Sequence, residues 1–281
     1  MDNKLYVTDL DGTLLNSEIE ASDHTVKVIN ELIAHGIKIT FSTSRSIYTA
    51  SILLKNIDFE LPCITFNGAF ITDMKTKQIV QKNLLTHETY DEIVACASKL
   101  GLKPYVFGIN SNKEERLLYE SPENVAQQQF LCERKLRNDK RLQPKLHEER
   151  LHEVINCSFL YTYDTVQELK EQLLHSLGES VSIKVIKDIY NDGYYTLEVS
   201  NKNANKGDML ICLAQMLGVP LKDITVFGDQ SNDMEMFALA GTSVAVENAS
   251  EELKHKATTI IKSNNEDGVA EYIFQQYKDI M

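Results

Sequence analysis

Short apolar segments alternate with helix-length segments at both ends of the chain, and no other feature limits the possible folds as strongly. Residues 5–8, 37–41 and 63–66 are apolar and are separated by stretches with helical spacing of apolar residues. The same order returns from Asn205 to the C-terminus. Strands joined through helices of this length lie parallel in one sheet with right-handed crossovers. The sequence therefore predicts an α/β domain built from both ends of the chain.

The middle of the chain has a different order of elements. It contains expected strands at 104–109, 157–163, 181–187 and 194–199, and expected helices at 87–100 and from Asp164 onward. The turn Asn191-Asp192-Gly193 between two of these strands predicts a hairpin. The charged stretch 111–152 is expected to be solvated helix and loop. We therefore predict an α+β domain at residues 85–195, inserted into a core domain of residues 1–84 plus 196–281.

Composition narrows the possible partners and the compartment. There are 29 Lys and Arg residues against 41 Asp and Glu residues, which gives a net charge of −12. Such a chain repels nucleic-acid backbones, but a metal ion or one local lysine still permits a small phosphorylated ligand. The five cysteines form no Cys-x-x-Cys pair, which indicates reduced thiols and a cytoplasmic protein. No apolar run approaches about 18 residues, so no membrane span is expected.

Four polar loops follow expected strands of the core domain. They comprise residues 9–13, 43–45, 67–69 and 228–233. Ligands of open parallel sheets bind beyond the carboxyl ends of the strands. We therefore expect these four loops to meet at one crevice.

The first of these loops has the pattern Asp-x-Asp-Gly-Thr, with Asp9 and Asp11 directly after a strand. Asp-Gly alone is a common turn, but two carboxylates so placed can divide the work of a nucleophile and a proton-exchanging group. Their repulsion raises one pKa unless a cation intervenes. Asp229 and Asp233 supply further oxygen ligands, so a hard divalent cation such as Mg²⁺ is the expected partner.

The other loops carry neutral and positive donors. Thr43 and Ser44 offer hydroxyl and N–H groups at a helix start, where anions commonly bind. Lys206 is either a surface lysine or a phosphate clamp, and Asn232 is either a helix cap or a phosphate donor. Arg45 either faces the inserted domain or forms a surface ion pair, and the sequence does not decide between these.

Taken in order, these motifs resemble those of the haloacid dehalogenase-like phosphohydrolases, and in particular the Cof-type branch. The resemblance is carried by Asp-Leu-Asp-Gly-Thr-Leu at 9–14, Phe-Ser-Thr-Ser-Arg at 41–45, Asn-Lys-Gly-Asp at 205–208 and Gly-Asp-Gln-Ser-Asn-Asp at 228–233. It covers nearly all of the α/β part. It implies a Rossmann-like parallel-sheet core domain with an inserted α+β cap domain. Ser44 stands where the family often has Gly, which leaves the backbone N–H in place.

The resemblance also implies a phospho-aspartate mechanism with Mg²⁺ as the cofactor. Asp9 would attack phosphorus, and Asp11 would protonate the leaving group and then activate water. The expected phosphate-binding residues are Leu10, Thr43, Ser44, Lys206 and Asn232. The expected metal ligands are Asp9, Asp11 through its backbone carbonyl, and Asp229. Asp233 would orient this metal site through water or through Lys206.

The position of the insertion favours a particular branch of the family. The stretch between Thr13 and Thr43 is only long enough for one helix and one strand, so the cap lies between Ala69 and Lys206, as in Cof-type proteins. The substrate is expected to be a small phosphorylated metabolite. Two alternatives stay open, a phosphotransferase and a non-catalytic metabolite-binding regulatory protein on the same fold. The sequence specifies neither the substrate nor the oligomeric state.

Overall fold

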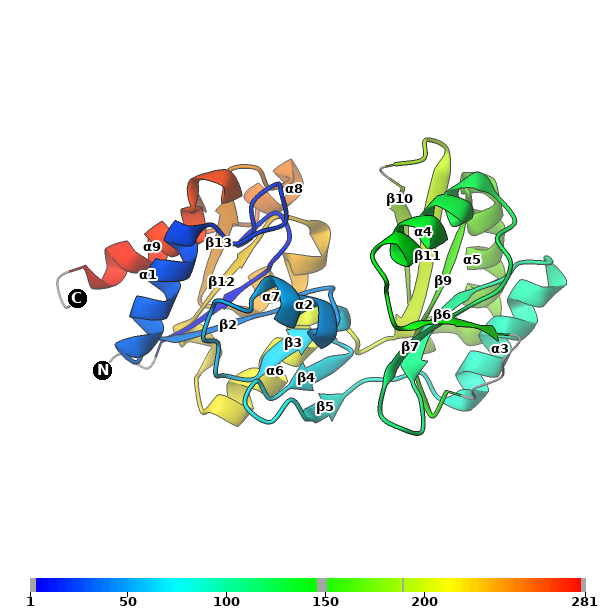
Figure 1. The fold of residues 1–281 in the computed structure, drawn as a ribbon, viewed down its shortest axis with the longest axis horizontal. Coiled ribbons are helices and arrows are strands. Elements are labelled where there is room, and N and C mark those ends of the chain that lie inside the picture. The colour runs from blue at the N-terminus through cyan, green and yellow to red at the C-terminus, as the bar shows by residue number, and fades with distance from the viewer. Residues whose placement is uncertain (1–3, 146–150, 189, 279–281) are drawn as a thin grey trace. The chain divides into compact units, whose positions relative to one another are not determined.

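The structure, a computed structural model, describes residues 4–145, 151–188 and 190–278. The chain forms two compact units, which we call the core unit and the cap unit (Figure 1). The core unit contains residues 1–82 and 203–281, and the cap unit contains residues 83–202. The predicted return to the core at residue 196 falls inside a strand of the cap unit that continues to Asn201, so the second boundary lies later than expected.

The core unit contains a parallel five-stranded sheet in the order β14-β13-β12-β1-β2. Its strands are β1 (Leu5–Thr8), β2 (Lys38–Phe41), β12 (Ile224–Gly228), β13 (Thr242–Val246) and β14 (Thr259–Ile261). Strand β1 is buried along its whole length and pairs on one side with β12 and on the other with β2. A strand covered on both faces is continuously apolar, which is the pattern that the N-terminal segment shows. Both ends of the chain therefore contribute to one sheet and one hydrophobic core.

Helices cover this sheet, and a small second sheet lies beside it. The core-unit helices are α1 (Asp23–Ala34), α2 (Ile47–Leu53), α6 (Lys206–Leu217), α7 (Met234–Leu239), α8 (Glu251–Lys254) and α9 (Gly268–Tyr277). Helix α1 packs against α9, and α6 packs against α7. The second sheet is antiparallel and consists of β3 (Cys63–Thr65), β4 (Phe70–Thr72) and β5 (Ile79–Lys82). The strands β4 and β5 were not predicted from the sequence.

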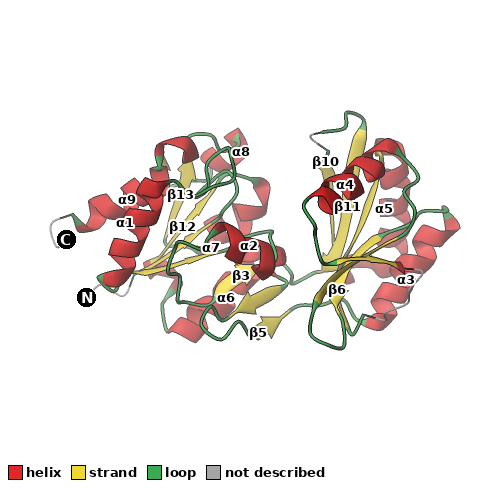
Figure 2. Cartoon of the chain, in the orientation of Figure 1, coloured by secondary structure: helices red, strands yellow, loops and turns green. Residues whose placement is uncertain are grey.

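The cap unit is an α+β layer structure with a six-stranded sheet in the order β10-β11-β9-β6-β7-β8 (Figure 2). Its strands are β6 (Tyr105–Ile109), β7 (Glu115–Tyr119), β8 (Leu142–Pro144), β9 (Glu153–Thr162), β10 (Val181–Lys187) and β11 (Tyr194–Asn201). Its helices are α3 (His87–Lys99), α4 (Val125–Leu136) and α5 (Tyr163–Leu177). Helices α3 and α5 share one apolar cluster with the sheet, and α4 shares another.

The stretch 111–152 was predicted wrongly in part. It contains the strands β7 and β8 as well as α4, and Leu117 and Leu118 of β7 are buried. Strand β7 was missed because charged residues surround its two apolar residues, which face opposite sides of a covered sheet. Within the described part of the chain, none of the helices is both long and apolar enough to span a membrane. All five cysteines are unpaired.

Candidate active site

The predicted loops of the core unit meet at the carboxyl ends of neighbouring parallel strands. Asp9 follows β1 and Asp229 follows β12, and these two strands are adjacent in the sheet. The first loop also approaches Asp229 closely at Gly12, which has a φ of +73°. A Cβ atom on Gly12 would lie 2.4 Å from Asp229 Oδ2. Only glycine therefore suits this position, both for its backbone conformation and for the space.

Lys206 is fully buried and joins two of the carboxylates. Its Nζ donates to Asp9 Oδ1 at 2.8 Å and to Asp233 Oδ1 at 2.6 Å. It is the first residue of α6, and the side chain of Asn205 caps this helix. The Asn205 backbone packs directly against Gly68, where a Cβ atom would approach the Asn205 carbonyl oxygen to 2.2 Å. The turn at Gly68 therefore fixes the start of α6 and with it the position of the lysine.

The two oxygens of Asp233 are both engaged. Oδ1 accepts from Lys206, and Oδ2 accepts from the backbone N–H groups of Asp229 at 3.1 Å and Gln230 at 3.2 Å. Asp9 differs, because its Oδ2 has no hydrogen-bond partner among the described residues. One oxygen of Asp9 is thus held by a cation while the other stays open for chemistry.

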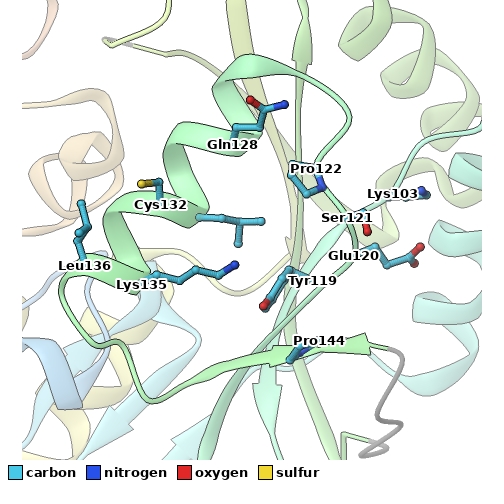
Figure 3. A pocket seen from close by; sticks show the side chains of 11 residues that line it. Lys103, Tyr119, Glu120, Ser121, Pro122, Gln128, Cys132, Lys135, Leu136 and Pro144 are labelled. Carbon is cyan, nitrogen blue, oxygen red and sulfur yellow. The ribbon is translucent and has the colours of Figure 1, made fainter.

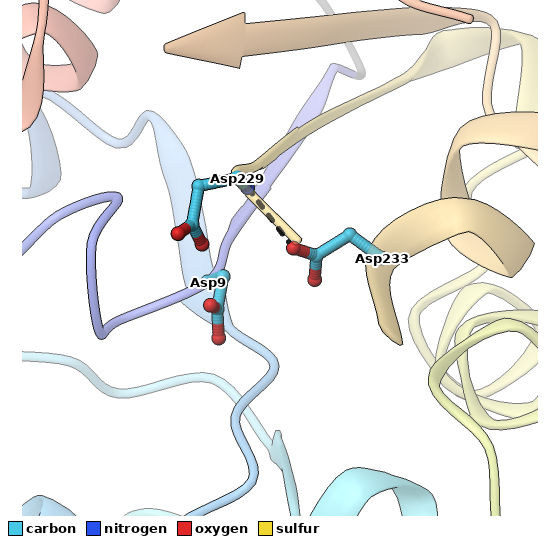
Figure 4. A group of neighbouring side chains, drawn as sticks. All are labelled: Asp9, Asp229 and Asp233. Atoms are coloured by element: carbon cyan, nitrogen blue, oxygen red, sulfur yellow. Dashed lines mark hydrogen bonds between the residues drawn. The ribbon is translucent and has the colours of Figure 1, made fainter. Parts of the chain in front are cut away.

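Asp9, Asp229 and Asp233 form a buried group of carboxylates (Figure 4). One oxygen of each lies within 4.8 Å of the others. Asp229 Oδ1 accepts from the Thr13 hydroxyl at 3.1 Å, which orients this carboxylate. Three carboxylates and one lysine leave an excess of negative charge, and oxygen ligands at this spacing suit a hard divalent cation.

The pKa values of the two carboxylates and the lysine reflect this excess of negative charge. Burial raises the pKa of Asp9 to about 8, with Lys206 opposing and Asp233 adding to the shift. Burial also raises the pKa of Asp229 to about 6, and Asp233 contributes in the same direction. Burial alone would lower the pKa of Lys206, but the carboxylates of Asp233 and Asp9 outweigh it and raise that pKa. The lysine is therefore charged, while the carboxylates compete for a second cation.

Asp11 and Arg45 form a two-pronged ion pair in the same unit. Arg45 Nε donates to Asp11 Oδ2 at 2.7 Å, and an Arg45 terminal nitrogen donates to Asp11 Oδ1 at 2.5 Å. This decides the question that the sequence left open, since Arg45 has a defined partner in the first loop. A forked guanidinium fixes both the position and the plane of a carboxylate.

The predicted phosphate-binding residues fall into different settings. The Thr43 side chain is buried, and its hydroxyl oxygen accepts from the backbone N–H of Arg45 at 3.1 Å. Ser44 is exposed. The Leu10 side chain lies in the hydrophobic core, so only its backbone faces polar surroundings. Asn232 donates one side-chain N–H to Asn67 Oδ1 at 3.0 Å, which leaves a second N–H available.

Two supporting residues were not assigned a role from the sequence. Thr13 holds Asp229, and Asn67 holds Asn232. Both lie within loops that the sequence singled out, but a motif does not show which side chains pair across loops.

The cap unit has an open hollow of about 780 Å³ beside α4 and β7, where Tyr119, Leu131 and Lys135 line it (Figure 3). It contains none of the predicted site residues. Its lining combines a few charged side chains with a larger apolar surface, as many exposed hollows do.

The family of the chain follows from this fold and from a direct match. A model of the haloacid dehalogenase-like hydrolases matches residues 6–273. The chain therefore belongs to this family, and the insertion between Ala69 and Lys206 agrees with its Cof-type branch. The resemblance inferred from the motifs is confirmed, as is the expected combination of a parallel-sheet core with an α+β cap.

Relatives with assigned activities are similar over nearly the whole chain. A 5-amino-6-(5-phospho-D-ribitylamino)uracil phosphatase of Bacillus subtilis is 29% identical over 97% of both chains. A second phosphatase of that name from the same organism is 27% identical, over 97% of this chain and 95% of its own. With this family and these relatives, the chain is a phosphoric monoester hydrolase.

Solved structures show the same architecture. A protein from Thermotoga maritima superposes with a TM-score of 0.78, is 27% identical and is covered over 97% of both chains. A haloacid dehalogenase-like hydrolase from Bacteroides thetaiotaomicron superposes with a TM-score of 0.80 at 24% identity, over 97% of this chain and 99% of its own. The second likeness shows the fold alone.

Proposed function

We propose that the protein is a magnesium-dependent phosphatase that hydrolyses small phosphomonoesters through a phospho-aspartate on Asp9. The observation that carries this proposal is the state of Asp9. Its carboxylate is buried, Lys206 holds Oδ1, and Oδ2 has no partner among the residues that the structure describes. A nucleophile needs one oriented, open oxygen beside cations that attract the substrate phosphate.

The cluster of three carboxylates fits a magnesium ion. Asp9 and Asp229 would hold it together with the Asp11 backbone carbonyl, because Asp233 already uses both oxygens on Lys206 and backbone N–H groups. The bound ion would neutralise charge on the phosphate and on Asp9. Asp233 would act indirectly, by holding Lys206 and the loop that carries Asp229.

Asp9 Oδ2 would attack phosphorus while the bond between phosphorus and the ester oxygen breaks. Asp11 would give its proton to the departing oxygen and then take one from the water that attacks the phospho-aspartate, which frees phosphate and Asp9. Arg45 donates to both oxygens of Asp11, so Asp11 would act as the acid only after Arg45 releases at least one of them. The ion pair would then hold Asp11 in place between turnovers.

The remaining donors would bind the phosphate oxygens. Lys206 supplies a fixed charge, and Asn232 keeps one N–H free beside its bond to Asn67. Thr43 can donate its hydroxyl hydrogen, since the bond that it makes to the Arg45 backbone uses only its oxygen lone pair. Leu10 and Ser44 would contribute backbone N–H groups.

The names of the relatives suggest where to look for the substrate. Because two phosphatases similar over nearly the whole chain carry 5-amino-6-(5-phospho-D-ribitylamino)uracil in their names, we take a phosphorylated ribityl compound as the first substrate to test. The net charge of −12 supports a small metabolite in preference to a nucleic acid. The five unpaired cysteines support a cytoplasmic location.

The test is release of inorganic phosphate from a panel of phosphomonoesters, with Mg²⁺ and with EDTA. Asp9→Asn is the test variant, and Asp58→Asn, at an exposed position of the core unit, is its matched control. We expect magnesium-dependent release that Asp9→Asn abolishes and Asp58→Asn retains. Release that survives Asp9→Asn would refute the phospho-aspartate assignment, and transfer to an added alcohol in place of water would identify a phosphotransferase.

Asp11 has its own test, because a general acid matters most for poor leaving groups. Asp11→Asn should slow hydrolysis of an alkyl phosphate far more than hydrolysis of 4-nitrophenyl phosphate, whose leaving group departs without a proton. Equal slowing of both esters would contradict the acid role. A protein that stays folded, binds Mg²⁺ and releases no phosphate from any ester would favour the non-catalytic binding protein.

A further inference from the structure

Three consecutive residues after β3 have left-handed backbone conformations. The φ angle is +50° at Phe66, +51° at Asn67 and +94° at Gly68. Within the described ranges, no other two neighbouring residues both have a positive φ. Such conformations cost free energy for a residue with a side chain, so they persist only where the surroundings hold them. We call Phe66–Gly68 the left-handed turn.

Backbone hydrogen bonds tie the left-handed turn to the loop that carries Thr43. The Phe66 N–H donates to the carbonyl oxygen of Arg45 at 2.9 Å, and the Asn67 N–H donates to that of Thr43 at 3.0 Å. The Ala69 N–H donates to the Phe66 carbonyl oxygen at 3.0 Å, which closes the turn. These three bonds fix the turn relative to a residue that is predicted to bind phosphate.

The Asn67 side chain joins the turn to a second phosphate-binding loop. Its Oδ1 accepts from Asn232 Nδ2 at 3.0 Å, and both side chains are half-buried. This is the one hydrogen bond that holds the Asn232 side chain among the described residues. An amide nitrogen carries two hydrogens, so fixing one of them also fixes the direction of the other. Without Asn67, the free N–H of Asn232 would not be held in one direction.

The turn also contacts the start of α6. Gly68 lies so close to the Asn205 backbone that a Cβ atom would approach the carbonyl oxygen to 2.2 Å. Lys206 is the next residue and the first of the helix. The left-handed turn therefore contacts all three loops whose side chains are predicted to bind phosphate, although it supplies none of those side chains itself.

The residue type at position 67 indicates that its side chain has a task. Glycine adopts a positive φ at no steric cost, so glycine would suit this position if the chain only had to turn. Asparagine tolerates the conformation better than most residues, but less well than glycine. At Asn67 the cost is offset by the acceptor that the side chain presents to Asn232. Phe66 has a packing reason, since its ring lies edge-on to that of Phe70 with centroids 5.8 Å apart.

We propose that Asn67 is a positioning residue for phosphate binding, which holds the Asn232 amide so that its free N–H meets a phosphate oxygen. This inference rests on the proposed function, because it places the phosphate among the loops around Asp9. Asn67 acts through Asn232 and not on the phosphate. The loss of the Asn67 side chain should therefore weaken phosphate binding only while Asn232 is present. Mg²⁺ binding should not change, because the Asn67 side chain bonds to Asn232 and to none of the expected metal ligands.

The experiment is a double-mutant cycle of Asn67→Gly and Asn232→Ala. Glycine keeps the positive φ and removes the acceptor. Asn138→Gly is the matched control, because Asn138 has the same φ of +51° and lies exposed on the cap unit. Inorganic phosphate in saturating Mg²⁺ is the probe, and its affinity is measured by isothermal titration calorimetry. The rise of Tm with Mg²⁺ concentration gives the Mg²⁺ affinity, and hydrolysis of 4-nitrophenyl phosphate is measured separately.

We expect Asn67→Gly to weaken phosphate binding by about 3- to 10-fold, the effect of one neutral hydrogen bond. Asn138→Gly should bind phosphate as the wild type does. Asn232→Ala should weaken binding at least as much as Asn67→Gly, and the double variant no more than Asn232→Ala alone. The Tm of Asn67→Gly should differ from that of the wild type by no more than the Tm of Asn138→Gly does, and its Mg²⁺ affinity should be unchanged.

Additive losses in the double variant would overturn the inference, since Asn67 would then act on phosphate without Asn232. Unchanged phosphate binding in Asn67→Gly, or no binding in the wild type, would overturn it as well. Lower Tm together with weaker Mg²⁺ binding in Asn67→Gly, but not in Asn138→Gly, would show a structural role in place of a positioning one. If phosphate binding follows the cycle while no ester is hydrolysed, the phosphatase proposal fails and this inference stands.

Discussion

The raised pKa of Asp9 predicts that the metal-free protein becomes less stable as the pH rises. Burial and Asp233 raise this pKa to about 8, against the opposing effect of Lys206. In the unfolded chain an aspartate releases its proton near pH 4. Between these values the folded state holds a proton that the unfolded state has lost. The associated stability is therefore fully present below about pH 4 and disappears as the pH approaches 8.

The size of the effect follows from the shift. Each pH unit in this range corresponds to about 1.4 kcal/mol for one proton. Between pH 5 and pH 7, wild type should lose about 3 kcal/mol relative to Asp9→Asn, whose amide does not titrate. In a domain of this size, about 1 kcal/mol changes Tm by about 2–4 °C, so the expected difference is about 6–12 °C. Asp229 titrates in both proteins, so its contribution to the pH dependence of stability largely cancels in the comparison.

Differential scanning calorimetry in EDTA from pH 5 to pH 8 makes this measurement, with Asp58→Asn as the matched control. The control should follow wild type at every pH. Saturating Mg²⁺ should remove the excess pH dependence of wild type, because a metal ligand must give up its proton. Parallel Tm curves for wild type and Asp9→Asn in EDTA would refute the reasoning, since they would mean that Asp9 is already ionised in the folded protein.

Three further substitutions test the supporting contacts of the site. Lys206→Met leaves two carboxylates buried without their cation, so at pH 8 in EDTA it should lower the unfolding free energy by about 3–5 kcal/mol, measured by urea denaturation. Gly12→Ala forces a Cβ atom against Asp229 and should weaken Mg²⁺ binding, measured by the rise of Tm with Mg²⁺ concentration. Thr13→Val removes the hydroxyl that orients Asp229 and should weaken Mg²⁺ binding by about 10- to 100-fold in the same titration. An unchanged Mg²⁺ titration in either of the last two would contradict the assigned contact.

Much of the core unit could be predicted because each of its strands and loops can be recognised from a short stretch of the sequence. Each parallel strand is a short apolar run, and each is followed at once by its polar loop. Adjacent strands of a parallel sheet end at the same edge, so placing Asp9 and Asp229 close together needed no knowledge of side-chain geometry. Lys206 could be placed for the same reason, since it starts a helix that follows the return of the chain to the core.

The pairings between loops could not be predicted in this way. Arg45 with Asp11, and Asn67 with Asn232, depend on rotamers and on loop conformations such as the positive φ of Asn67. The strand β7 was missed because its charged neighbours dominate the local composition.

The residues proposed for phosphoryl transfer all belong to one of the two units. The core unit contains Asp9, Asp11, Lys206 and Asp229, which lie on one packed sheet and its loops. In the proposed mechanism each of these residues would act on phosphate, on metal or on the leaving oxygen, so none of them would distinguish one alcohol from another. Discrimination between esters would therefore depend on other residues.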